Sequence, residues 1–145
     1  MPVSSQTDDL RAILMRYVGR ILNRQPYFSS QIRQKLSKKL LQITGQSQTS
    51  IIDEIIDDLK KAKYLNDDYL LEGYINNKLQ KLQGPKIITF KLKQLGIKSA
   101  QVQDMLNKDE VKKNIDIAVK KLKQKYQNLD EYKINSKLYQ RGFKV

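Results

Sequence analysis

The stretch Ile88–Ile97, ITFKLKQLGI, decides the fold because it recurs 46 residues later as Ile134–Phe143, INSKLYQRGF. The two copies share an isoleucine, a leucine, a glutamine, a glycine and a closing apolar residue. Residues 31–36, QIRQKL, begin the same pattern, with their isoleucine 56 residues before Ile88. The four-residue step from isoleucine to leucine puts both side chains on one helical face, and the glycine allows a sharp turn. We therefore predict a short helical module that is used three times.

Apolar residues recur with a helical period along the rest of the chain, and no stretch alternates with the period of two expected of a strand. Pro26 ends the first helix, whereas Pro85 occupies the first position of the fifth. We predict an all-α fold of eight helices, beginning near residues 8, 29, 50, 66, 85, 99, 109 and 130. The expected capping residues are Asp8 or Asp9, Ser29 or Ser30, Ser50 with Asp53, Asn66 or Asp67, Ser99 and Asp130.

The spacing of the copies leaves two further helices between them, so the predicted module has three helices. The first module covers residues 1–65 and includes a polar N-terminal tail over residues 1–8. The second module covers residues 66–108. Residues 109–145 form an incomplete third module with two helices.

The composition favours a polyanionic partner and argues against catalysis. The chain has 28 Lys and Arg against 15 Asp and Glu, a net charge of +13. Such a charge attracts nucleic acid, an acidic protein surface or an anionic membrane, although lysines can also simply keep a surface solvated. With no Cys and no His, the chain lacks disulfides, thiolate chemistry and the commonest general base and zinc ligand. We expect no catalytic residue, no metal and no cofactor, and therefore a protein that is not an enzyme.

The N-terminal residues carry neither the basic start nor the apolar core of a signal peptide. No apolar run approaches the roughly 20 residues that a membrane-spanning helix requires. We therefore predict a soluble, cytoplasmic protein.

Three arginines at a spacing of four, Arg16, Arg20 and Arg24, form a row opposite the apolar stripe of the first helix. Like charges at this spacing repel each other by a few tenths of a kcal/mol per pair. One interpretation is that an anionic partner neutralises this arginine row. The other is internal neutralisation by an acidic cluster on the third helix, which consists of Asp53, Glu54, Asp57 and Asp58.

Basic residues are more concentrated in the second half of the chain. Residues 84–145 hold 15 Lys and Arg and 6 Asp and Glu, whereas residues 1–83 hold 13 and 9. Phosphate contacts need only mobile ammonium groups of this kind, although a lysine-rich helix is usually a solvated one. We assign the tyrosines mainly to apolar stripes and the core. Besides the arginine row, the candidates for partner or DNA contacts are Lys86, Lys93, Lys112, Lys113, Lys120, Lys121, Lys123, Lys125 and Arg141.

Several strings, in their order and spacing, resemble the RecX family. They are Tyr27–Leu36, Lys63–Asp68 (KYLNDD), Gly84–Ile97 and Arg141–Phe143. The chain departs from the family pattern at an insertion over residues 40–48, at Lys63, where a glycine is usual, and at its end just after Phe143. The matched residues, which we interpret as fold-defining, are Tyr64, Leu65, Asp67, Gly84, Pro85, Ile88, Leu92, Gly96, Gly142 and Phe143.

The resemblance implies tandem three-helix modules in an elongated, curved array. It also implies a monomeric regulator that binds the RecA filament and its DNA, without sequence specificity, and that restrains RecA assembly, ATP hydrolysis and strand exchange. Recombination, DNA repair and the SOS response would be its setting. The residues themselves leave two alternatives open. One is a helical protein that binds DNA directly. The other is an adaptor whose seventh helix binds another protein or an anionic membrane.

Overall fold

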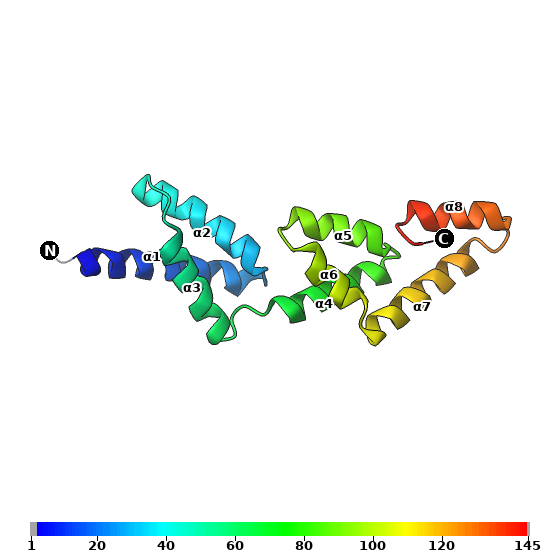
Figure 1. Ribbon diagram of the computed structural model, residues 1–145, viewed down its shortest axis with the longest axis horizontal. Coiled ribbons are helices and arrows are strands. Elements are labelled where there is room, and N and C mark those ends of the chain that lie inside the picture. Colours follow the sequence, from blue (N-terminus) through cyan, green and yellow to red (C-terminus); the bar gives the residue numbers. More distant parts are fainter. Residues whose placement is uncertain (1–2, 145) are drawn as a thin grey trace. The chain divides into compact units, whose positions relative to one another are not determined.

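The computed structural model describes residues 3–144, and of residues 3–7 only the backbone is described. The described chain contains eight helices and no strand, which confirms the all-α prediction (Figure 1). The helices are α1 (Val3–Arg24), α2 (Ser29–Thr44), α3 (Thr49–Lys61), α4 (Asp67–Gln80), α5 (Pro85–Gln94), α6 (Ser99–Leu106), α7 (Asp109–Lys125) and α8 (Glu131–Gln140).

The chain divides into two compact units, residues 1–70 and residues 71–145, with the boundary inside α4. We refer to them as unit 1 and unit 2 and describe each by itself. The division into three modules, which would place boundaries at residues 65 and 108, remains a prediction.

Unit 1 is built from α1, α2 and α3, whose apolar stripes meet in one core. Leu14 and Val18 of α1, Ile32 and Leu36 of α2 and Ile55 of α3 are fully buried there. Within α1 and within α2 the two positions lie four residues apart, a spacing that places side chains on one helical face. Each such side chain contributes about 1.5–3 kcal/mol by leaving water, so the stripes hold the three helices together.

Unit 2 contains the rest of α4 and the four helices that follow it. Within it α5 packs against α6, α6 against α7, and α7 against α8. The residues buried in this unit include Leu71, Ile75, Leu79, Ile88, Leu92, Val102, Ala118, Leu122, Leu138 and Phe143. The isoleucine and leucine at the start of the repeat, Ile88 and Leu92, are both fully buried.

The two full copies of the repeat end in the same hydrogen-bonded turn. Gly96 has φ 88° and Gly142 has φ 90°, so both lie in the left-handed region. The Ile97 N–H donates to the Leu92 carbonyl, and the Phe143 N–H to the Leu138 carbonyl, each at 3.0 Å. Glycine is favoured at such positions because a Cβ would approach the following carbonyl.

Two other helices end in a left-handed turn without a glycine. Lys63, after α3, has φ 64°, and Leu82, after α4, has φ 62°. The Tyr64 N–H reaches back to the Leu59 carbonyl at 2.9 Å, as in the glycine turns. The glycine that the family pattern places at position 63 would therefore fit a left-handed turn, which here is formed by a lysine.

Two of the expected side-chain caps are present. The Asn66 Oδ1 accepts from the Tyr69 N–H at 3.2 Å at the start of α4, and the Asp130 Oδ1 accepts from the Lys133 N–H at 2.8 Å at the start of α8. Both caps satisfy a backbone donor that has no partner within its own helix.

Other start positions were predicted wrongly. The first described helix begins at Val3, so Asp8 and Asp9 lie inside it and residues 3–8 of the predicted polar tail are helical. Residues 3–7 contain no glycine or proline, so a helix can continue there beyond its apolar stripe. In α2, α3 and α6 the serine assigned to the cap lies within the helix, and the capping position falls on Phe28, Gln48 and Lys98.

A tertiary contact explains the start of α2. The Phe28 N–H donates to the Oε1 of Gln31 at 2.9 Å, and the Ser29 N–H donates to the Oδ1 of Asp67 at 2.8 Å. Asp67 lies 38 residues away at the start of α4. A carboxylate from the start of another helix thus accepts the Ser29 N–H, one of the donors at the start of α2 that have no partner within the helix.

Candidate partner-binding surfaces

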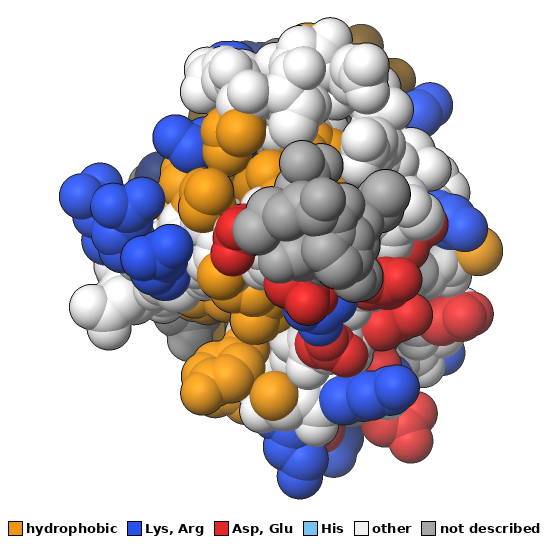
Figure 2. All heavy atoms as spheres, turned by 90° about the vertical axis from the view of Figure 1, so that its left-hand side faces the viewer, with side chains coloured by type: hydrophobic (Ala, Val, Ile, Leu, Met, Phe, Trp, Pro, Cys, Tyr) orange, Lys and Arg blue, Asp and Glu red, His pale blue; other side chains and the backbone are white. Residues whose placement is uncertain are grey.

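Three of the four residues of the acidic cluster on α3 pair with arginines within unit 1. The Arg11 Nη1 lies 3.3 Å from the Glu54 Oε2, and Arg11 also pairs with Asp58. Arg33 of α2 pairs with Asp53. Figure 2, which views the molecule from its N-terminal side, shows basic side chains lying among the acidic ones on this face. Arg11 and Arg33 were not among the predicted site residues, because charge pairing between helices leaves no local signal in the sequence.

The arginine row therefore does not form ion pairs with the acidic cluster of α3. Arg16, Arg20 and Arg24 are exposed on α1, and none of them forms an ion pair with a carboxylate of the described residues. The Arg16 Nε donates to the Ala12 carbonyl of the same helix at 3.4 Å. Arg16 and Arg20 line a hollow of about 400 Å³ together with Ile13. Guanidinium groups in this arrangement are available to a phosphate or a carboxylate.

The six lysines of α7 are all exposed. They are Lys112, Lys113, Lys120, Lys121, Lys123 and Lys125. Within the part of the chain that the structure describes, none of them pairs with a carboxylate. Lys112 and Lys86 of α5 both line a hollow of about 680 Å³ in unit 2, so the structure brings together two predicted candidates from different helices.

The basic residues around α5 and α8 differ from one another in their exposure and contacts. Lys86 and Lys93 are exposed, and the Lys86 Nζ lies 4.7 Å from the centre of the Tyr139 ring. Arg141 is half-buried, and its carbonyl accepts a 2.6 Å hydrogen bond from the Gly84 N–H. The backbone of Arg141 thus has a structural contact whatever its side chain binds.

Two glycines of the family strings meet at this junction. The Lys86 N–H donates to the Gly142 carbonyl at 3.1 Å, beside the bond from Gly84 to Arg141. A Cβ on Gly84 would lie 2.4 Å from the Gly142 carbonyl carbon, and a Cβ on Gly142 would lie 2.9 Å from the Ile87 side chain. The start of α5 and the end of α8 therefore touch backbone to backbone, which only glycine permits.

The assignment of the tyrosines to the core is wrong for half of them. Tyr64, Tyr69, Tyr132 and Tyr139 are exposed, as is Phe90. Instead of packing inward, several rings lie beside lysines, for example Tyr126 with Lys125 and Lys137 at 5.5 and 5.7 Å. The exposure of Phe90 could have been predicted from the sequence. Phe90 stands two positions from both Ile88 and Leu92 and so falls on the opposite face of α5.

No metal site is indicated, since no three Asp, Glu, His or Cys residues of the described chain gather closely enough to hold an ion. Among the described helices none is both long and apolar enough to cross a membrane.

No family model matches the sequence. Among curated proteins, the chain is 32% identical over 79 residues to the regulatory protein RecX of Streptococcus pneumoniae, covering 54% of this chain and 31% of that protein. It is also 32% identical over 99 residues to RecX of Streptococcus agalactiae, covering 66% of this chain and 38% of that protein. Over these stretches the chain is similar to the RecX family.

Solved RecX structures share the fold. A crystal structure of the regulatory protein RecX matches with a TM-score of 0.69 and 24% identity, over 95% of this chain and 69% of that one. RecX from Lactobacillus salivarius matches with a TM-score of 0.68 and 22% identity, over 99% and 92% of the two chains. The chain spans about a third of the length of the curated RecX relatives, which are named as regulatory proteins and not for a reaction.

Proposed function

We propose that this chain is a member of the RecX family and a regulator of RecA that acts in the cytoplasm as a monomer. It binds RecA–DNA filaments and mainly inhibits their assembly, ATP hydrolysis and strand exchange. The proposal is supported by the likeness to regulatory proteins and by a net charge of +13, which suits a polyanionic filament. No reaction at the protein is needed, because a ligand with different affinities for two filament states shifts the balance between them.

The observation that carries the proposal is the unpaired arginine row. Its guanidinium groups are attached about 6 Å apart along the helix axis, since four residues rise by that distance. The nearby acidic cluster, which was the alternative partner, is paired with Arg11 and Arg33. An external anionic surface relieves the repulsion within the row, and arginine binds carboxylate and phosphate groups in a bidentate manner.

The test is a titration of the protein into RecA that is hydrolysing ATP on single-stranded DNA. We expect a dose-dependent loss of ATPase activity at substoichiometric protein. Unchanged activity at equimolar protein would contradict the proposal.

The role of the arginine row is tested by the combined substitutions Arg16→Glu, Arg20→Glu and Arg24→Glu. We expect at least a tenfold rise in the concentration that half-inhibits RecA, because three charge-assisted contacts become repulsive. The matched control is Lys38→Glu, Lys60→Glu and Lys61→Glu, which changes the net charge of unit 1 equally at other exposed positions. Equal losses in the two variants would assign the effect to net charge and not to the row.

A second candidate function is direct, non-specific DNA binding, which the six exposed lysines of α7 favour. Each phosphate neutralised on duplex DNA adds about −0.9 to the slope of log affinity against log salt. Tight binding to naked duplex without RecA, lost with Lys120→Glu, Lys121→Glu, Lys123→Glu and Lys125→Glu, would support this candidate. Inhibition of RecA by the same variant, undiminished, would place the filament-binding surface outside α7.

A further inference from the structure

Unit 2 exposes three aromatic rings on α5 and α8. Phe90 is 63% exposed, Tyr132 is 81% exposed and Tyr139 is 62% exposed. Rings of this size are ordinarily buried in cores or interfaces, where they contribute large apolar areas. We call these three residues the aromatic face. Their exposure means that they contribute little to the core of unit 2.

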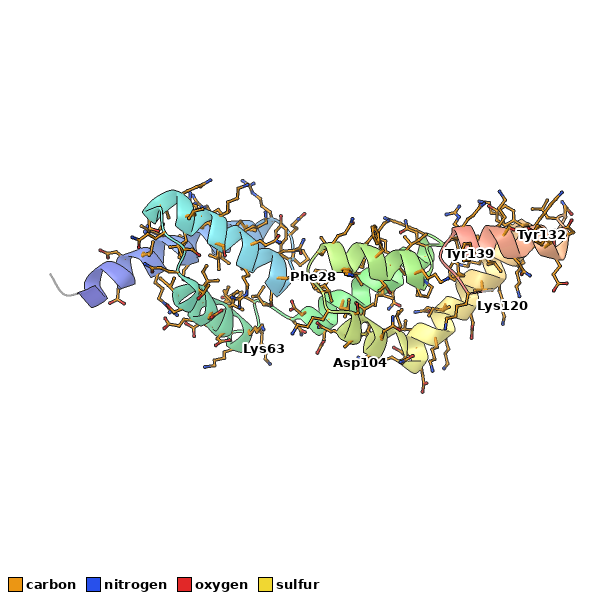
Figure 3. The ribbon with its side chains drawn as sticks, turned by 45° about the horizontal axis from the view of Figure 1, so that its top comes forward. Phe28, Lys63, Asp104, Lys120, Tyr132 and Tyr139 are labelled. Carbon is orange, nitrogen blue, oxygen red and sulfur yellow. The ribbon has the colours of Figure 1, made fainter. Side chains whose placement is uncertain are left out.

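The three rings lie along one line because the end of α8 meets the start of α5 in space. The end of α8 meets the start of α5 through the hydrogen bonds from Gly84 and Lys86, and both helices run in the same direction in Figure 1. Tyr132 and Tyr139, labelled on α8 in Figure 3, are seven residues apart and share one face of that helix. Phe90 shares a face of α5 with Lys86, which lies over the Tyr139 ring. Seven residues rise by about 10 Å, so the rings are separated along the line and do not cover one another.

Lysines interleave with the rings. The Lys86 Nζ is 4.7 Å from the Tyr139 ring centre, and Lys93 is exposed one turn beyond Phe90. Lys137 stands two positions before Tyr139 and so falls on the opposite face of α8, where its Nζ lies 5.7 Å from the Tyr126 ring. Helix α5 contains no acidic residue, and α8 contains Glu131 alone, in its first turn. The line thus combines flat apolar rings with positive charge.

We propose that the aromatic face binds single-stranded nucleic acid directly, without RecA. Unpaired bases stack on Phe90, Tyr132 and Tyr139, while Lys86 and Lys93 contact the phosphates. Every base has a π-face, so such binding tolerates any sequence. A duplex keeps its bases stacked inside and offers the rings nothing. An acidic protein surface would pair with the lysines but would not need the aromatic rings. The combination of lysines and exposed rings therefore favours single-stranded nucleic acid as the ligand.

The test measures fluorescence anisotropy of a labelled mixed-sequence oligodeoxynucleotide with no RecA present. The combined substitutions Phe90→Ala, Tyr132→Ala and Tyr139→Ala should weaken binding at least tenfold, since stacking contributes about 1–3 kcal/mol per base, or about fivefold or more per ring. The pair Tyr132→Phe and Tyr139→Phe keeps the rings and should retain affinity. Tyr64→Ala with Tyr69→Ala is the matched control, because these tyrosines are similarly exposed but lie in unit 1.

A probe without bases tests the unaltered protein. An abasic oligomer of the same length should bind at least tenfold more weakly than the base-bearing strand at equal salt. Equal affinity for the two, or equal competition by polyglutamate and by unlabelled DNA, would show charge attraction alone and overturn the proposal. An equal loss in the Tyr64 and Tyr69 control would also overturn it. Because this assay contains no RecA, a negative result here would not contradict the proposed inhibition of RecA. A negative result in the ATPase titration would likewise not contradict binding of single strands by the aromatic face.

Discussion

The two units of this chain treat their charges differently. Unit 1 holds 11 basic and 8 acidic residues, and Arg11 and Arg33 tie α1 and α2 to the acidic cluster of α3. Unit 2 holds 17 basic and 7 acidic residues, and its described part contains no ion pair within 4 Å. Positive charges crowd there: burial, and then the charges of Lys81 and Lys91, lower the pKa of Lys78. In unit 1 some charged side chains form ion pairs that join helices, whereas in unit 2 most charged side chains face solvent and are accessible to a partner.

The units also differ in how a repeated helix begins. In unit 2 the start of α5 donates to the backbone carbonyls of Arg141 and Gly142. In unit 1 the start of α2 donates to a side chain, the carboxylate of Asp67. Backbone contact demands glycines on both sides, whereas a side-chain contact demands one residue of the right reach. The first arrangement should therefore be the more sensitive to substitution.

The largest expected effect follows Gly84→Ala. The new Cβ would lie 2.4 Å from the Gly142 carbonyl carbon, so α5 and α8 must separate or tilt. We expect the free energy of unfolding of unit 2 to fall by about 2–4 kcal/mol, as in overpacked cores. Denaturant titration followed by circular dichroism, with amide exchange in α8, measures this.

The control for that substitution is Gly73→Ala in α4 of the same unit. A Cβ there meets nothing within 4 Å, and alanine suits a helix better than glycine. The expected gain is about 0.5–1 kcal/mol. A loss of similar size in both variants would mean that the close approach at Gly84 is not the cause.

The second effect in size is that of Asp67→Ala on unit 1. It removes the acceptor of the Ser29 N–H and a negative charge near the start of α2, and we expect a loss of about 1 kcal/mol. Asp67→Asn keeps an oxygen at the same place and should recover much of it. Thermal unfolding of the three proteins at one salt concentration compares them. Equal losses in both variants would show that the charge, and not the hydrogen bond, matters.

These contrasts also show what the sequence reveals. Periodicity identified the eight helices, and the repeat identified the glycines that end α5 and α8, because both signals are local. The meeting of Gly84 with Gly142, the Asp67 cap and the pairing of Arg11 with α3 join distant segments, so no local pattern marks them. The arginine row was found from its spacing, but only the structure gave the acidic cluster other partners. The aromatic face was missed because a tyrosine near an apolar stripe was taken as buried.

A smaller effect is expected at Lys63, whose left-handed φ of 64° is unfavourable for a residue with a Cβ. Lys63→Gly should stabilise unit 1 by about 0.5 kcal/mol, since relief of the backbone strain exceeds the added freedom of the unfolded chain. Gly45→Ala is the matched reverse, at φ 71° with open space around it, and should destabilise by a similar amount. Equal melting temperatures for Lys63→Gly and the unaltered protein would mean that the lysine turn carries no strain.

The smallest effect, and the one that addresses the charge contrast most directly, is that of salt. The pairs of Arg11 with Glu54 and Asp58 are partly exposed, so screening should weaken unit 1 by a few tenths of a kcal/mol. The same screening relieves the repulsion among Lys78, Lys81 and Lys91 and should stabilise unit 2. Amide exchange in α3 should therefore quicken, and that in α5 slow, as sodium chloride rises from 0.05 to about 0.5 M. Arg11→Ala should reduce the response of α3, where the pair of Arg33 with Asp53 remains, and leave that of α5 intact. A response of the same sign in both helices would mean that salt changes the stability of both units in the same way, independently of the ion pairs of unit 1 and the lysine repulsion of unit 2.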